Sequence, residues 1–253
     1  MNNYISHKNT KPVALITGGA VRIGAAICRT LSQKYSIALH YNSSSTQAES
    51  LQAELTDKNA AVVLFQADLT RPKACKKLAD AVVNKLGQID LLVNNAAVFY
   101  KDDAELFKLA KMKVLNMDAP EHLINALVPR LKKNGGSIVN IADIAGICEF
   151  TNYKAYSRTK KELLTLTRRQ TVFLAENNIR INAVCPGTVQ FAAHCNDEEK
   201  KRIVEAIPMK KIGRPQDIAD AVWFLANSTF VTGQIITIDG GRLAAQLNIQ
   251  NSK

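Results

Sequence analysis

The sequence has no apolar run that approaches the roughly 20 residues needed to cross a membrane, so we expect no membrane-spanning segment. Residues 1–11 are polar and lack the hydrophobic centre of a secretory signal, which predicts a flexible N-terminal arm and a cytoplasmic location. Cysteine is also scarce. The chain has five cysteines, an odd number without Cys-x-x-Cys spacing, which predicts neither a metal site nor a disulfide framework.

Acidic residues are in short supply. Asp and Glu number 22 against 33 Lys and Arg, so the formal net charge is +11. The basic residues are scattered in pairs such as Lys76–Lys77 and Lys210–Lys211, and no aromatic-rich patch accompanies them. We therefore expect no nucleic-acid binding, and instead a general attraction for anionic cofactors and substrates.

Apolar runs of strand length alternate with amphipathic runs of helix length along the chain. Several strand-like runs are continuously apolar, as in a parallel sheet covered on both faces. The alternation predicts an α/β fold, with one Rossmann-type domain over residues 12–253 and a doubly wound parallel sheet flanked by helices. The expected strands are Val13–Thr17, Ser36–Tyr41, Ala61–Ala67, Leu91–Asn94, Ser137–Ile141, Arg180–Val184 and Gln234–Ile238. The expected helices are Ile23–Lys34, Thr46–Lys58, Pro72–Leu86, Ala104–Lys132, Tyr153–Glu176 and Pro215–Leu225.

A glycine-rich turn, "TGGAVRIG", joins the first expected strand to the first helix. Gly18 and Gly24 flank the turn, and the helix that begins at Ile23 offers free amide groups and a positive dipole end to a phosphate. Arg22 stands where the common pattern has a further glycine. The strand before the turn and the helix after it predict a dinucleotide-binding site.

The end of the second expected strand indicates which dinucleotide binds. An NAD site usually has an acid there that binds the ribose hydroxyls, but the first acidic residue of this chain is Glu49. Arg22 can face this strand end and pair with a 2′-phosphate, which favours NADPH over NADH. In the alternative, Arg22 is a solvated surface residue and the serines form a plain loop. The residues expected to contact the cofactor here are Tyr41, Asn42, Ser43 and Ser44.

Tyr156 and Lys160 lie four residues apart in "YSRTK", which places them on one face of a helix. A free tyrosine has a pKa of about 10, and a neighbouring ammonium group and a cationic nicotinamide would lower it. We therefore expect Tyr156 to exchange a proton near neutral pH.

From about Pro12 to Arg242, the sequence resembles the short-chain dehydrogenase/reductase superfamily. The glycine turn is followed, in the expected order, by Ala67-Asp68-Leu69, "NNAA" (Asn94 to Ala97), Asn116, Tyr156 with Lys160, Pro186-Gly187 and Asp239 to Gly241. The resemblance implies a homotetramer built on the helices expected over 104–132 and 153–176.

The resemblance also implies roles for individual residues. Asp68 and Leu69 would border the adenine. Asn95 and Ala96, with Ala97 beside them, would line the cofactor ribose. Lys160 would hold the nicotinamide ribose, and Asn116 would keep a water and the active-site helix in place. The residues implied to contact the nicotinamide are Pro186, Gly187 and Val189.

One position departs from the superfamily pattern. Most members carry a catalytic serine thirteen residues before the tyrosine, and this chain has Asp143 there. A serine hydroxyl is suited to holding a carbonyl oxygen, whereas a carboxyl group can carry a proton to a ring nitrogen or orient it. Asp143 therefore favours reduction of a C=N bond in a nitrogen heterocycle. The alternative is a degraded, inactive site.

A narrower resemblance, to the pteridine and dihydromonapterin reductases, combines Arg22 in the turn, "HYNSS" after the second strand, and Asp143. Phe99 stands where that branch has an aromatic ring that sandwiches the pterin against the nicotinamide. In the alternative, Phe99 is a core aromatic under a loop. The resemblance implies a substrate loop over 188–211, and its substrate-binding set is Arg22, Phe99, Asp143 and Tyr156.

Three hypotheses follow. The first is an NADPH-dependent pteridine reductase that acts on dihydrobiopterin, dihydromonapterin or dihydrofolate. The second is a carbonyl reductase of the same superfamily, such as one for 3-oxoacyl thioesters. The third is a non-catalytic NADPH-binding sensor or scaffold.

Overall fold

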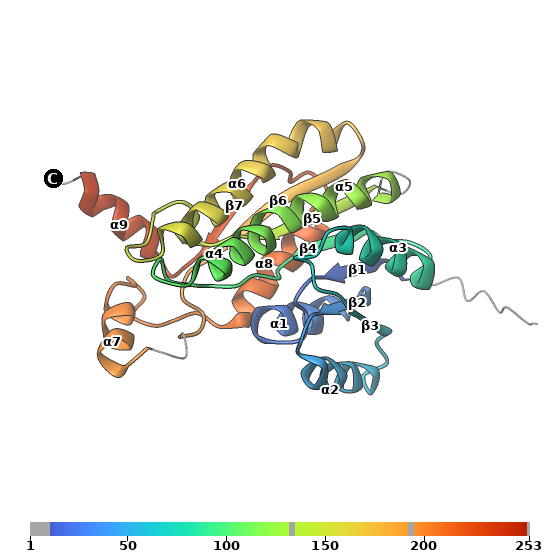
Figure 1. Cartoon of the computed structure of the whole chain (residues 1–253), viewed down its shortest axis with the longest axis horizontal. Coiled ribbons are helices and arrows are strands. Elements are labelled where there is room, and N and C mark those ends of the chain that lie inside the picture. The colour runs from blue at the N-terminus through green and yellow to red at the C-terminus, as the bar shows by residue number, and fades with distance from the viewer. Residues whose placement is uncertain (1–10, 132–134, 192–194, 252–253) are drawn as a thin grey trace, which may run out of the picture.

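The computed structural model describes residues 11–131, 135–191 and 195–251. Within them, seven strands form one parallel sheet in the order β3-β2-β1-β4-β5-β6-β7 (Figure 1). The chain winds outward from β1 in one direction and then from β4 in the other, so the predicted doubly wound, Rossmann-type fold is confirmed. Residues 1–10 of the predicted arm and residues 192–194 of the expected substrate loop lie outside the described residues. The strands are β1 (Val13–Ile16), β2 (Ser36–Tyr41), β3 (Val62–Gln66), β4 (Leu91–Asn94), β5 (Gly136–Ile141), β6 (Ile179–Pro186) and β7 (Ile235–Ile238).

Helices cover both faces of the sheet because alternate residues of each strand point to opposite sides. In β1, Val13 and Leu15 pack into one core with the apolar side chains of α3, α5 and α6. Ala14 and Ile16 pack into the other with those of α1, α2 and α8. The helices are α1 (Arg22–Leu31), α2 (Ser45–Thr56), α3 (Ala74–Leu86), α4 (Leu106–Lys113), α5 (Ala119–Leu131), α6 (Lys154–Ala175), α7 (Asp197–Glu205), α8 (Pro215–Asn227) and α9 (Arg242–Asn251). Every helix in the described ranges is too short or too polar to span a bilayer.

The structure differs from the predicted elements in three places, one of which is α9, a helix that the sequence did not predict. The single helix expected over 104–132 is divided into α4 and α5 by a π-helical turn, Val114–Asp118. The segment expected to be a substrate loop contains α7, which starts at an Asn196–Glu199 capping box. In Figure 1, α7 and α9 lie at one end of the molecule, beyond the sheet.

A chain of buried polar side chains fixes α6 to the sheet. Asn94 and Asn140 face each other across β4 and β5, and the Asn94 amide donates to Asn140 Oδ1 at 2.8 Å. The Asn140 amide in turn donates to Thr167 Oγ1 on α6 at 2.9 Å. Because a buried polar group without a partner is costly, this chain defines one position of α6 along the sheet.

Replacing Thr167 tests this attachment. Thr167→Val keeps the shape of the side chain but leaves the buried Asn140 amide without its acceptor, so we expect a loss of about 1–3 kcal/mol in the free energy of unfolding. Urea denaturation measures this loss. Thr165→Val, the same change at an exposed position of α6, is the control and should stay within about 0.5 kcal/mol of the unaltered protein. Equal losses in the two variants would contradict the attachment.

Candidate active site

The predicted site residues gather at the carboxyl edge of the parallel sheet. Gly18 follows β1, Asp68 follows β3, Asn95 follows β4, Asp143 follows β5 and Gly187 follows β6. These strands run parallel in one sheet, so residues far apart in sequence come to its carboxyl edge.

The glycine turn is closed so tightly that a side chain does not fit at Gly24. A Cβ atom on Gly24 would lie 2.1 Å from the Gly18 carbonyl oxygen, and Gly18 itself has a φ of +61°. The Asn95 amide donates to the carbonyl oxygens of Thr17 and Gly18, at 2.9 and 3.0 Å, and holds the turn against β4. The Thr17 hydroxyl accepts from the backbone amides of Asn95 and Ala96. This bare backbone at the start of α1 fits a dinucleotide phosphate.

Arg22 occupies a strained position in this turn. Its φ of +52° lies in the left-handed region, which costs a non-glycine residue about 1–3 kcal/mol. Its Nε donates to Gln190 Oε1 at 2.7 Å, in the segment after β6. Because β6 and β2 lie on opposite sides of β1, the guanidinium points away from the β2 end in this conformation. The predicted contact with a 2′-phosphate stays a prediction.

The adenosine end of the predicted site is open and has no acid at β2. Asn42 and Ser43 are exposed, and Tyr41 and Ser44 are partly buried. Asp68, past the end of β3, accepts hydrogen bonds from the backbone amide and hydroxyl of Thr70, which lower the pKa of its carboxyl group. Leu69 is buried below it.

The centre of the site is a hydrogen bond between a phenol and a carboxyl group. The Tyr156 hydroxyl donates to Asp143 Oδ2 at 2.9 Å, and the backbone amide of Ala145 donates to Asp143 Oδ1 at 2.8 Å. Tyr156 is buried on the first turn of α6. The aspartate that replaces the usual serine is therefore in direct contact with the tyrosine.

Lys160 lies one turn further along α6 and is also buried. Its Nζ donates to the Ile141 carbonyl oxygen at 3.0 Å and lies 5.7 Å from the centre of the Tyr156 ring. Burial lowers the pKa of Lys160 to about 8, partly offset by the Asp143 carboxylate. The helical spacing correctly predicted that both side chains share a face.

The expected lowering of the Tyr156 pKa by Lys160 is wrong, and the expected effect of a cationic nicotinamide stays a prediction. Burial raises the pKa of Tyr156 well above its usual value, and the Asp143 carboxylate, which accepts a hydrogen bond from the phenol, raises it further. Burial also raises the pKa of Asp143, against the opposing effects of Ala145 and Lys160. The Tyr156 phenol is therefore protonated at neutral pH.

Asn116 lies in the π-helical turn between α4 and α5 and is buried. Its side chain accepts from the Val98 amide and donates to the Val98 carbonyl oxygen, both at 2.9 Å, and also contacts Thr159 Oγ1 at 3.3 Å. It thus ties the segment after β4 to α6. Such turns recur at functional sites.

Phe99 lies above the tyrosine with 42% of its surface exposed, so the core alternative is wrong. Its ring is stacked on Tyr153 with the ring centres 4.4 Å apart, and meets Tyr156 edge-on at 4.6 Å. Across the site, Pro186 is buried at the end of β6, while Gly187 and Val189 are partly buried after it. Ala97 is exposed in the segment that leads to Phe99.

Sequence reasoning missed four side chains of this region. Tyr153 supports Phe99, and Gln190 holds Arg22. Arg242 donates to Thr188 Oγ1 at 2.9 Å and lies 5.2 Å from the centre of the Phe150 ring. His40 contacts the glycine turn from β2. A histidine inside an apolar strand was the one signal in the sequence that could have pointed to His40.

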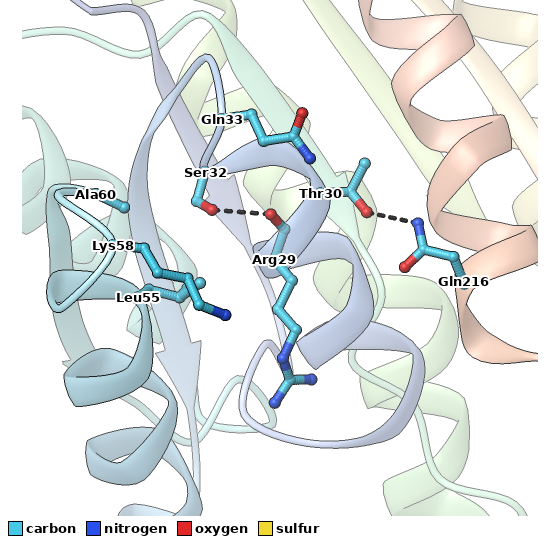
Figure 2. Close-up of a pocket in the computed structure, with 8 residues that line it drawn as sticks. All are labelled: Arg29, Thr30, Ser32, Gln33, Leu55, Lys58, Ala60 and Gln216. Atoms are coloured by element: carbon cyan, nitrogen blue, oxygen red, sulfur yellow. Dashed lines mark hydrogen bonds between the residues drawn. The ribbon is translucent and has the colours of Figure 1, made fainter.

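A separate surface pocket lies between the ends of α1 and α2 and the start of α8 (Figure 2). The Ser32 hydroxyl donates to the Arg29 carbonyl oxygen, and the Gln216 amide donates to Thr30 Oγ1. None of the predicted site residues line it. It plays no part in the site described above.

A glycine turn at the carboxyl edge of a doubly wound sheet, with a buried tyrosine and lysine on one helix, defines a dinucleotide-dependent oxidoreductase. Residues 19–242 match the family model adh_short_C2, described as "Enoyl-(Acyl carrier protein) reductase". The chain belongs to the short-chain dehydrogenase/reductase superfamily, whose members use NAD(H) or NADP(H).

Curated relatives cover nearly the whole chain. The 3-oxoacyl-[acyl-carrier-protein] reductase FabG of Staphylococcus epidermidis is 30% identical, over 90% of this chain and 97% of the relative. FabG of Thermotoga maritima is 32% identical, over 90% and 96%. The 7alpha-hydroxysteroid dehydrogenase of Bacteroides fragilis is 31% identical, over 90% and 93%.

Asp143→Asn should stabilise the fold at alkaline pH. Burial raises the pKa of Asp143 in the folded protein, so the unfolded chain releases this proton at lower pH than the folded protein does. The unaltered protein therefore loses stability relative to the variant as the pH rises from about 3.9, the pKa of a free aspartate, through the pKa of the folded state. Asparagine still accepts from Ala145. At about pH 8 we expect the free energy of unfolding of the variant to exceed that of the unaltered protein by roughly 1 kcal/mol, or about 2–4 °C in Tm. This difference should disappear near pH 4.

Asp102→Asn is the matched control with the opposite sign. Asp102 accepts from the backbone amides of Ala155 and Lys154 at the start of α6, and these bonds lower its pKa. This variant should therefore lose stability at about pH 8. Thermal unfolding across pH measures both, and a loss in Asp143→Asn at high pH would contradict the assignment.

Proposed function

We propose that this chain is an NADPH-dependent pteridine reductase, which reduces a C=N bond of dihydrobiopterin, dihydromonapterin or dihydrofolate to give the tetrahydropterin. The hydrogen bond from Tyr156 to Asp143 carries the proposal. A serine hydroxyl is suited to holding a carbonyl oxygen, whereas a carboxyl group coupled to a phenol can deliver one proton to a ring nitrogen or orient it. The exposed Phe99 ring offers a stacking surface for a flat heterocycle.

The residues then have separate tasks. The hydride for the carbon of the C=N bond, such as C6 of a 7,8-dihydropterin, would come from bound NADPH, and the ring nitrogen would need one proton. Tyr156 holds that proton because its pKa is raised. Asp143 orients the hydroxyl group, and the buried Lys160 ammonium stabilises the negative charge left on the pair.

The names of the relatives favour a second candidate over this proposal. Two of those described above are 3-oxoacyl-[acyl-carrier-protein] reductases, so a carbonyl reductase for 3-oxoacyl thioesters is the rival function. Tyr156 and Lys160 suit carbonyl reduction equally well. Asp143 is the residue that separates the two candidates.

A substrate panel tests the proposal directly. Dihydrobiopterin, dihydromonapterin, dihydrofolate and acetoacetyl thioester are offered separately, each with NADPH and with NADH. We expect turnover of at least one dihydropterin with NADPH at a kcat/KM at least about tenfold above that for the thioester. Turnover of the thioester with failure of every pterin would establish the rival function.

Tyr156→Phe is the control for catalysis. It removes the proton donor and should cost most of the turnover, on the order of 10²–10⁴-fold, while NADPH affinity is largely kept. Tight NADPH binding without turnover of any substrate, by the unaltered protein, would support the non-catalytic alternative.

Arg22→Ala tests the cofactor assignment. Loss of a charge-assisted pair with the 2′-phosphate should weaken NADPH about tenfold or more and leave NADH nearly unchanged. Fluorescence titration measures both dissociation constants. Equal losses would instead assign Arg22 to the diphosphate shared by the two cofactors. Arg169→Ala, which removes an exposed arginine paired with Glu121 on α5, is the control.

We further propose that the protein is a cytoplasmic homotetramer assembled through α4, α5 and α6, in which residues 188–211 cover the substrate. Exposed apolar side chains support an interface on these helices. Leu106 and Phe107 on α4 and Val172 on α6 are 85%, 65% and 69% exposed. Contacts between copies would remove this apolar surface from water.

A further inference from the structure

His40 is a buried histidine on β2, directly below the cofactor turn, and only 2% of its surface is exposed. We propose that His40 is a positioning residue of the cofactor site, whose neutral ring ties Gly18 in the glycine turn to the Ala67-Asp68 segment at the adenine side. The inference depends on the dinucleotide part of the proposed function and is independent of the pterin assignment.

The hydrogen bonds determine which ring nitrogen carries the proton. The Gly18 backbone amide is a donor, and it lies 3.1 Å from His40 Nδ1, which must therefore accept. The Ala67 carbonyl oxygen is an acceptor, and it lies 3.0 Å from Nε2, which must therefore donate. Both contacts are satisfied together only by the neutral Nε2–H tautomer.

The surroundings keep the ring in this neutral form. Burial lowers the pKa of His40, against the smaller opposing effect of the Ala67 carbonyl oxygen. A second proton on the ring would also turn Nδ1 into a donor that faces the Gly18 amide. Protonation would therefore break the bond to the turn.

The two bonds link both halves of the predicted cofactor site. The His40 carbonyl oxygen accepts from the Gly19 amide at 2.8 Å, so backbone and side chain together bind two successive amides of the turn. Gly18 has the left-handed φ of +61°, which is only one of several backbone conformations open to glycine when nothing holds it. Fixing it before the cofactor arrives reduces the ordering cost of binding.

Two substitutions separate the two ring contacts. His40→Asn places an amide oxygen near the position of Nδ1, where it can accept from Gly18, but the new side chain is too short to reach Ala67. His40→Gln places an amide nitrogen near the position of Nε2, where it can donate to Ala67, but the new side chain offers Gly18 no acceptor. The two variants are therefore a matched pair, in which each loses one buried hydrogen bond.

The dissociation constant for NADPH, measured by fluorescence titration, is the first readout. We expect His40→Asn to stay within about threefold of the unaltered protein, and His40→Gln to bind at least about tenfold more weakly, at similar Tm values. A merely structural role would make affinity follow Tm in both variants. Equal affinities in the two variants, or weaker binding by His40→Asn, would overturn the proposal.

The second readout is the protonation state of the His40 ring, which can be measured without cofactor. Long-range ¹H–¹⁵N correlation spectra of the histidine rings of the unaltered full chain report the tautomer, and the spectrum of His40→Asn identifies the signals of His40. We expect the neutral Nε2–H pattern at neutral pH. An Nδ1–H pattern, or a doubly protonated ring, would overturn the assignment. If NADPH fails to bind the unaltered protein, the cofactor proposal fails while this spectrum still tests the histidine.

Discussion

The hydrogen bond between Tyr156 and Asp143 is the interaction on which the rest of the site depends. It joins the first turn of α6 to the end of β5, so it requires α6 to lie at one position along the sheet. Three further contacts supply that position: Asn116 with Thr159, Lys160 with the Ile141 carbonyl oxygen, and Thr167 with Asn140. Burial raises the pKa of both groups, and the Asp143 carboxylate raises that of Tyr156 further, so the phenol stays protonated at neutral pH.

The backbone of the predicted cofactor turn is also held in one conformation. Gly24 has no room for a side chain, Arg22 is held with a positive φ, and His40 binds the turn from below. Backbone strain persists only where surrounding contacts hold it, and here Gln190 accepts a hydrogen bond from the strained residue, Arg22. Its bond to Gln190 connects the segments after β1 and β6, which flank the predicted path of the dinucleotide.

Local pattern predicted the regular elements well, and tertiary contacts explain the differences. The helix expected over 104–132 is interrupted by a π-helical turn, in which Asn116 points inward and binds Val98 and Thr159. The hydrophobic periodicity of the sequence does not reveal a single π-helical turn within a helix. The pKa of Tyr156 was predicted wrongly because the spacing shows only that Tyr156 and Lys160 share a helix face. It does not show that the Lys160 ammonium lies over the Tyr156 ring, or that the Tyr156 hydroxyl donates to Asp143. The motif order predicted the superfamily, while the relatives by name favour carbonyl substrates over pterins.

The sequence by itself determined the fold class, the edge of the sheet at which the site forms and the residue types available there, because strand periodicity, glycine spacing and the order of motifs are local properties of the chain. The tertiary structure alone decided how those residues are charged and connected. Whether Asp143 meets Tyr156, which nitrogen of His40 bears the proton and where Arg22 points all depend on partners from 13 to 168 residues away, and on how much water the fold excludes between them.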